Sequence, residues 1–149
     1  MAHRNDRAGN EAQIRQLIGD RTEAIRAKDV DAAMASYAPD LLLFDLAPPL
    51  QYRVAAVNRK SLKEWFASFQ GPVGYEIRDL TVAASDEVAF GHGLSHMSGT
   101  RTDGTETDVW VRTTLCLRRI DGKWMITHEH VSVPFEMTPP FRASLGLKP

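Results

Sequence analysis

The stretch LRRIDGKWMITHEHVSVPF, at residues 117–135, decides the fold. Its Asp121-Gly122 pair is a strong β-hairpin signal, because glycine tolerates the positive φ that a tight turn requires. Apolar and polar residues then alternate with a period of two, which predicts a strand whose neighbouring side chains point to opposite faces. One of these faces carries Trp124, Ile126, His128 and His130. The sequence thus predicts an inner sheet surface that begins apolar and ends in two imidazoles.

Working outward, three upstream segments show the same alternation. They are residues 75–84, 87–101 and 106–120, and the last strand spans 123–134. Short polar turns separate them, of which Asp103-Gly104 is a second strong hairpin signal. The second half of the chain is therefore predicted to be a β-meander.

The first half has a helical pattern. Ile14, Leu17, Ile18 and Ile25 recur at helical spacing, which predicts an amphipathic helix to about Lys28. Asp29 is a predicted N-cap for a short second helix that Pro39 ends. A short strand is predicted over residues 41–45. Ser61 and Glu64 have the spacing of a capping box, which predicts the start of a third helix.

Helices followed by long antiparallel strands are typical of an α+β domain. The sheet must curve around the three helices to bury both apolar faces, which predicts a cone-shaped half-barrel. We expect a single domain over residues 1–149 with its core at about 10–136. The first dozen residues and the tail at 137–149 are expected to be peripheral, the tail extended over the surface or over a partner.

Composition narrows the classes of partner. The 149 residues are 43% hydrophobic and 25% charged, with a formal net charge of −1 and no run of like charges. The basic patch of a nucleic-acid binder or an anionic-membrane binder is therefore not expected. Small molecules or other proteins are the expected partners. A single cysteine, Cys116, suits a reducing compartment, and the N-terminus lacks an apolar signal, so we expect a cytoplasmic protein.

Three stretches resemble the nuclear transport factor 2-like superfamily, which includes ketosteroid isomerase, the SnoaL-like polyketide cyclases and the kinase association domains. They are AIRAKDVDAAMASYAPD at residues 24–40, the quoted stretch at 117–135, and Asp45 shortly after Tyr37. The resemblance covers about residues 10 to 136. The last strand is most similar to the SnoaL-like branch. The resemblance implies a cone with a pocket at its wide end.

The predicted pocket residues follow from the strand faces that this resemblance and the core position of Trp124 and Ile126 suggest. We expect the pocket to be lined by Tyr37, Trp65, His92, Leu94, His96, Arg112, Thr114, His128 and His130. A β-bulge would reverse a strand's parity locally. For each polar residue a structural role is the alternative: Tyr37 and Trp65 as core residues, and Arg112 in an ion pair with Asp45 or Glu129.

The resemblance to ketosteroid isomerase, in which a carboxylate at the end of the early strand moves the proton, implies that Asp45 is a general base. The oxyanion donors of that enzyme do not carry over, since Arg21 occupies the first-helix tyrosine position. His128 and Arg112 are the candidate donors that would stabilise an enolate or a carboxylate. Asp45 has the alternative of capping its loop through backbone N–H groups.

No metal or cofactor is expected. His92 and His96 lie four residues apart on a strand, roughly 13 Å at about 3.3 Å per residue, which is too far to share one ion. His128 and His130 would need a third ligand from elsewhere.

Two functions remain open. The first is an enzyme that acts by proton transfer on a small, partly apolar molecule, as an isomerase, cyclase, dehydratase or hydrolase. The alternative is a non-catalytic binding or oligomerisation module that resembles kinase association domains. Under both we expect a homodimer, because Val109, Val111 and Leu115 are assigned to an outer sheet face that would otherwise meet water.

Overall fold

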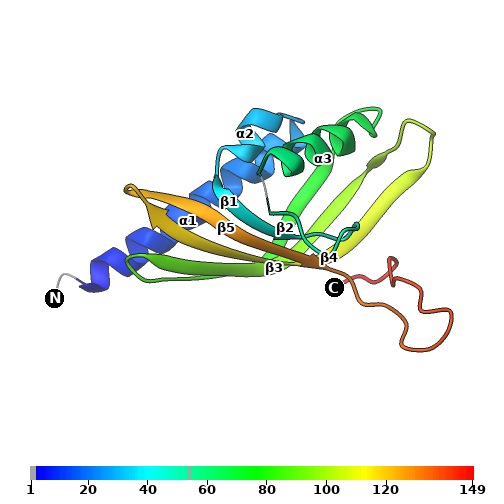
Figure 1. Cartoon of the computed structure of the whole chain (residues 1–149). Coiled ribbons are helices and arrows are strands. Elements are labelled where there is room, and N and C mark those ends of the chain that lie inside the picture. The colour runs from blue at the N-terminus through cyan, green and yellow to red at the C-terminus, as the bar shows by residue number, and fades with distance from the viewer. Residues whose placement is uncertain (1–2, 54) are drawn as a thin grey trace.

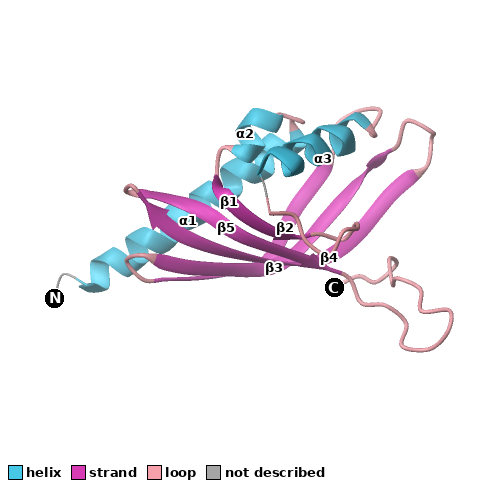
Figure 2. Ribbon diagram, viewed as in Figure 1, coloured by secondary structure: helices cyan, strands magenta, loops and turns pink. Residues whose placement is uncertain are grey.

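The computed structural model describes residues 3–53 and 55–149, with the side chains of 6–53 and 58–149. Three helices cover one face of a curved five-stranded sheet, and the other face carries no described helix (Figures 1 and 2). The elements in chain order are α1 (His3–Arg26), α2 (Val30–Met34), β1 (Tyr37–Phe44), α3 (Ala55–Ala67), β2 (Gly74–Ala84), β3 (Val88–Thr100), β4 (Glu106–Ile120) and β5 (Lys123–Ser132). The predicted α+β half-barrel is confirmed.

The strands lie in the order β1-β5-β4-β3-β2. All neighbours are antiparallel except β1, which runs parallel to β5. The four strands of the predicted meander thus pair in sequence, and β1 adds to the far edge. The sheet stays open between β1 and β2, which leaves the cone unclosed.

The helix ends correct three expectations, one of them in α2, which ends at Met34, so that Pro39 lies within β1 and does not end the helix. Helix α1 begins at His3, well before the periodic apolar residues start. Helix α3 begins at Ala55, so Ser61 and Glu64 lie inside the helix and the predicted capping box is wrong. The predicted N-cap of α2 is confirmed, since the Asp29 carboxylate accepts a hydrogen bond from the Ala32 N–H at 3.0 Å.

The core fills the space between the helices and the inner face of the sheet. One cluster joins α1 to β1, β4 and β5 through Ile14, Ile18, Leu41, Leu43, Leu115, Leu117, Trp124 and Ile126. A second cluster joins the end of α1 to α3 and β2 through Ala24, Ile25, Phe66, Phe69, Val73 and Tyr75. Burial of these side chains removes water from both apolar faces, which is the main force that curves the sheet around the helices.

A β-bulge divides the last strand. Leu117 of β4 lies opposite Ile126, whereas the next residue, Cys116, lies opposite His128. Thr127 is therefore the extra residue, and the alternation of faces is reversed beyond it. Glu129 continues the inner face that Ile126 begins, and His128 and His130 lie on the outer face.

No helix among the described residues is long and apolar enough to cross a membrane.

Candidate functional site

Three polar side chains meet on the inner face of the sheet. Arg21 comes from α1, Tyr37 from the first position of β1, and Glu129 from β5 beyond the bulge. The Arg21 Nη2 lies 3.1 Å from Glu129 Oε2 and also donates to the Tyr37 hydroxyl. That hydroxyl donates in turn to Glu129 Oε2. We call this set the inner polar cluster.

The inner polar cluster is buried, which strengthens its internal electrostatics. The exposed fractions of Arg21 and Glu129 are 9% and 4%. Burial alone would lower the pKa of Arg21, but the charge of Glu129 and the Tyr37 oxygen raise it above its usual range. Burial raises the pKa of Tyr37 well above its usual value, against the opposing effect of Arg21. At neutral pH Arg21 is therefore a cation and the Tyr37 phenol keeps its proton.

A second row of polar groups lies nearby on the wall of the cone. The Tyr75 hydroxyl of β2 donates to Ser95 Oγ at 3.5 Å, and Ser95 Oγ lies 2.8 Å from Thr113 Oγ1. All three residues are buried. Their hydroxyls extend the polar part of an otherwise apolar interior.

Asp45 lies immediately after β1, two residues beyond Leu43, which pairs with Glu129 of β5. It is exposed, and its Oδ1 accepts a hydrogen bond from the Leu46 N–H at 2.7 Å. Partial desolvation raises the pKa of this carboxyl, the Leu46 bond opposes the rise, and the charge of Glu129 adds to it. Asp45 thus makes the loop-capping hydrogen bond that was its alternative role, and the pKa of this same carboxyl is raised.

Five predicted pocket residues lie on the outer face instead. They are His92, Leu94 and His96 of β3 and Arg112 and Thr114 of β4. His96 Nε2 bonds Asp108 at 2.6 Å and its ring stacks on Trp110, while Arg112 Nε donates to Ser132 Oγ at 3.1 Å. The predicted inward orientation of these five is wrong, because the inner face of β4 is the opposite one.

His128 and His130 are also on the outer face. The His128 Nδ1 lies 2.7 Å from the Leu42 carbonyl oxygen, and the Phe44 ring packs edge-on against both imidazoles. The bulge at Thr127 is the physical reason that the predicted orientation of this pair is wrong. Trp65 lies on α3, half-buried against Phe66 and Phe69.

Of the predicted pocket residues, Tyr37 is the one that the inner polar cluster contains. Sequence reasoning missed Arg21 and Glu129 as site residues. A signal was present in β4, where Val111, Leu115 and Leu117 alternate on one face. They are far more apolar than Arg112 and the other residues that alternate on the opposite face. The first of these faces forms the core, so the assignment of Val111 and Leu115 to an outer dimer face is wrong; each is 2% exposed.

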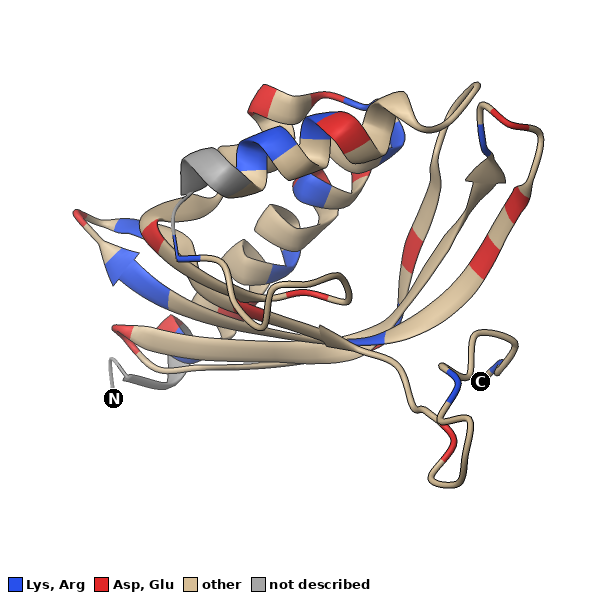
Figure 3. Cartoon of the chain, turned by 45° about the vertical axis from the view of Figure 1, so that its right-hand side comes forward, with Lys and Arg blue, Asp and Glu red and all other residues tan. Residues whose placement is uncertain are grey.

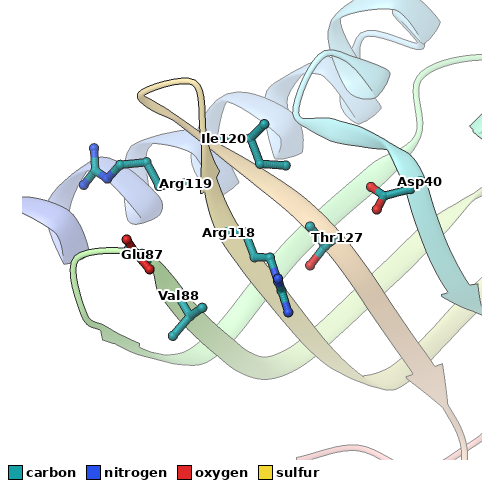
Figure 4. Close-up of a pocket in the computed structure, with 7 residues that line it drawn as sticks. All are labelled: Asp40, Glu87, Val88, Arg118, Arg119, Ile120 and Thr127. Atoms are coloured by element: carbon teal, nitrogen blue, oxygen red, sulfur yellow. The ribbon is translucent and has the colours of Figure 1, made fainter.

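The outer face carries a hollow of about 650 Å³ near the β4–β5 hairpin (Figure 4). Asp40, Arg118 and Thr127 contribute side chains to it from three adjacent strands. It shares no lining residue with the inner polar cluster, which lies on the other side of the sheet.

Among the described residues, no group of three or more histidine, cysteine, aspartate or glutamate side chains is placed to hold a metal ion. Hydroxyl, guanidinium and carboxylate groups in a mainly apolar interior are suited to bind a polar oxygen and to move protons.

The comparisons with known proteins agree with this architecture. A family model described as a SnoaL-like domain matches residues 14–136. An NTF2-like protein of unknown function from Pseudomonas putida KT2440 is 32% identical, with 95% of this chain and 98% of that chain covered and a TM-score of 0.86. A comparison with curated proteins gives no match.

Two more distant solved structures share the fold alone. A nuclear transport factor 2 (NTF2-like) superfamily protein from Salmonella enterica is 14% identical, covers 89% of this chain and 96% of its own, and has a TM-score of 0.76. A ketosteroid isomerase-like protein from Erwinia carotovora atroseptica is 20% identical, covers 87% and 97%, and has a TM-score of 0.70. By the family match over most of its length, this chain belongs to the SnoaL-like domain family, within the nuclear transport factor 2-like fold.

Proposed function

We propose that this protein binds a small, partly apolar molecule inside the cone and catalyses proton transfer on it without a cofactor, as an isomerase, cyclase or dehydratase. The observation that carries the proposal is the inner polar cluster. Burial of a guanidinium, a phenol and a carboxylate costs free energy that an apolar core would avoid. Such a grouping in the interior of a SnoaL-like domain is what acid–base chemistry requires.

The cluster has an unused hydrogen-bond donor. The Arg21 Nε is buried and has no acceptor among the described residues. A ligand oxygen that accepts from Nε would satisfy it, and negative charge that develops on this oxygen would be stabilised by the guanidinium. Arg21 thereby takes the donor role that the sequence suggested for His128 and Arg112.

In the proposed mechanism Asp45 is the general base. Its raised pKa brings its proton affinity closer to that of a useful base at neutral pH. The Asp45 carboxylate removes a proton from the carbon next to the ligand carbonyl, and the electron pair moves onto the carbonyl oxygen beside Arg21. For isomerisation Asp45 then returns the proton to a different carbon. For dehydration the enolate re-forms the carbonyl, the bond to the hydroxyl group on the next carbon breaks, and this group takes the proton from Asp45 and leaves as water.

Exchange of solvent deuterium into a ketone tests this proposal without knowledge of the natural substrate. The protein is incubated in D₂O with a panel of cyclic ketones such as 1-tetralone, and loss of the α-proton signal is followed by ¹H NMR. We expect exchange above the protein-free rate. Asp45→Asn should slow it by at least about a hundredfold, the usual contribution of a positioned base. Asp40→Asn is the matched control, because Asp40 is an exposed aspartate within β1, the strand that Asp45 follows.

The alternative, a non-catalytic binding or oligomerisation module, predicts a different result. The inner polar cluster would then be structural, and none of the ketones would exchange faster than in buffer or raise the melting temperature. Equal exchange in wild type and Asp45→Asn would remove the proposed base.

We further propose that the chain forms a homodimer through the outer face of the sheet. Phe90 and Val88 of β3 are 48% and 52% exposed there, and a second copy would cover them. A cytoplasmic location stays a prediction that rests on the single cysteine.

A further inference from the structure

Polar side chains cross the inner face of the sheet in a diagonal belt. The concave face of the sheet is turned toward the helices (Figure 3), and on it each strand contributes a buried residue with a hydroxyl or carboxyl group. In the order of the strands, these residues are Tyr75 of β2, Ser95 of β3, Thr113 of β4, Glu129 of β5 and Tyr37 of β1. We call the first three the hydroxyl row, and the last two belong to the inner polar cluster.

Neighbouring members of the belt are related by the same diagonal step. Ser95 pairs with Val111, two residues before Thr113. Thr113 pairs in turn with Val131, two residues beyond Glu129. Diagonal neighbours of this kind have Cα atoms about 7–8 Å apart. The Ser95 and Thr113 hydroxyl oxygens meet at 2.8 Å, whereas in the described part of the chain no hydrogen bond joins Thr113 to Glu129. The belt therefore has a gap between these two residues.

The two sides of this gap differ in the hydrogen bonds that they can still make. Tyr75 donates to Ser95, and one further bond joins Ser95 to Thr113, so the row has three hydroxyl protons for two hydrogen bonds. When Ser95 donates to Thr113, the proton without an acceptor among the described residues is the one on Thr113, next to the gap. On the other side, Glu129 accepts from the rest of the inner polar cluster and has lone pairs to spare. A group that fills the gap must therefore accept from the row and donate to Glu129, as a hydroxyl group does.

Burial makes the leftover proton unfavourable for folding. The exposed fractions of Ser95, Thr113 and Tyr75 are 0%, 5% and 8%. A buried hydroxyl group without a partner destabilises a fold, and a valine at position 113 would fill the same space without one. The Arg21 Nε, in the side chain that bonds Glu129, is a second buried donor without an acceptor. Two such donors on either side of one carboxyl group favour a ligand with two oxygen atoms.

The charges beside the gap favour a neutral ligand. Arg21 and Glu129 form an ion pair at 3.1 Å, so the guanidinium already has its counter-charge. A ligand carboxylate would meet the like charge of Glu129, which is unfavourable in a buried site. The hydroxyl row carries no charge of its own. A neutral molecule with a carbonyl and a hydroxyl group therefore matches the donors on both sides.

We propose that Thr113, with Ser95 and Tyr75 behind it, forms a subsite for a hydroxyl group of the substrate, and that the substrate is a neutral hydroxy-ketone. The substrate hydroxyl accepts from Thr113 and donates to Glu129, which closes the gap in the belt. This inference rests on the proposed function, in which a ligand oxygen accepts from Arg21, and it adds the residue that selects among ketones.

Binding of a matched set of ketones tests the subsite. Dissociation constants of 1-tetralone and of its monohydroxylated derivatives are measured by ligand-observed NMR. We expect the wild type to bind at least one derivative about fivefold to tenfold more tightly than 1-tetralone, which is what one hydrogen bond contributes. Thr113→Val keeps the shape of the side chain and removes its hydroxyl group, so it should lose this preference.

Two control variants separate the hydroxyl group from other effects. Thr114→Val removes an exposed hydroxyl group from the outer face of the same strand and should keep the preference. Thr113→Ser retains the hydroxyl group and should keep it as well. A purely structural role of Thr113 predicts that Thr113→Val lowers the free energy of unfolding without changing the ratio of the two dissociation constants.

The wild type gives a second measurement that needs no variant. Nuclear Overhauser effects should connect the bound derivative to the Thr113 methyl group. Their absence contradicts the subsite even if Thr113→Val does not fold. Equal affinity of the wild type for 1-tetralone and all of its derivatives, or a preference that survives in Thr113→Val, also contradicts it, and the gap then holds water alone.

The same ketones distinguish failure of the subsite from failure of the proposed function. Loss of the subsite leaves the proposed chemistry intact, because that chemistry is judged by the exchange of 1-tetralone and its dependence on Asp45. An intact preference together with equal exchange in wild type and Asp45→Asn removes the base and retains the subsite. If none of these ketones binds, both proposals are contradicted.

Discussion

Loss of the Glu129 carboxylate should destabilise this protein more than any loss of a surface charge. Glu129 is 4% exposed and accepts hydrogen bonds from both Arg21 and Tyr37. In Glu129→Gln the shape is kept, but the Arg21 guanidinium remains buried without its counter-charge. Removal of one partner from a buried pair costs about 3–5 kcal/mol, because the remaining charge is uncompensated.

This cost is large for a domain of this size. The total free energy of unfolding of a natural domain is about 5–15 kcal/mol, so the variant should lose a substantial part of it. The melting temperature should fall by about 10 °C, at roughly 2–4 °C for each kcal/mol in a chain of about 150 residues. Urea titration followed by tryptophan fluorescence gives the free energy directly.

Two further variants separate the buried charge from other effects. Glu23→Gln is the control, since Glu23 forms an ion pair with Arg26 in which the side chains are 70% and 44% exposed. It should change the stability by less than about 0.5 kcal/mol. The double variant Arg21→Met/Glu129→Gln also removes the cation that Glu129→Gln leaves without a counter-charge. It should recover much of the free energy of unfolding that Glu129→Gln loses. If Glu129→Gln costs no more than Glu23→Gln, Arg21 and Glu129 are not a coupled buried pair.

Two other predictions concern pH and the backbone. The pKa of Asp45 is raised in the folded state, so the folded protein holds this proton more tightly than the unfolded chain, and the contribution to stability should be lost as pH rises above 3.8 through the folded pKa. Urea midpoints measured at pH 3.5 and pH 7 should therefore decline less for Asp45→Asn than for the wild type. Equal declines would contradict the raised pKa. Gly99 has φ +147° and an added Cβ would lie 2.9 Å from the Phe69 ring, so Gly99→Ala should lower the free energy of unfolding by about 1–3 kcal/mol. Gly19 lies in α1 with open space around it, so Gly19→Ala should raise the free energy of unfolding by about 0.5–1 kcal/mol. Thermal denaturation measures both.

The elements of this fold could be read from local patterns. The hairpin signals at Asp103-Gly104 and Asp121-Gly122 predicted both turns at their observed places, and both glycines have positive φ. The Asp29 cap predicted the start of α2. These features depend on a few neighbouring residues, so they are visible in the sequence alone. The start of α3 was missed because the helix-forming residues before Ser61 outweigh its capping preference.

The candidate site could be predicted only in part. Asp45 lies at the end of the early strand, where the resemblance placed it, whereas Tyr37 begins β1 and is not part of the second helix that was expected to continue to Pro39. The imidazoles assigned to the pocket lie on the outer face. The error arose from carrying one parity along β5 from Trp124 to His130. The bulge at Thr127 reverses that parity halfway, and a polar alternation such as THEH gives no sign of where it occurs.

The sequence by itself determined the helices, the meander and the α+β class, because periodicity and turn chemistry act within a few residues. Only the tertiary structure decided which side of each strand faces the helices, and hence that Arg21, Tyr37 and Glu129 meet inside while the histidines lie outside. The physical reason is that strand parity has a period of two. One extra residue, or one choice of inner face, exchanges the interior for the exterior, and the packing of distant segments makes that choice.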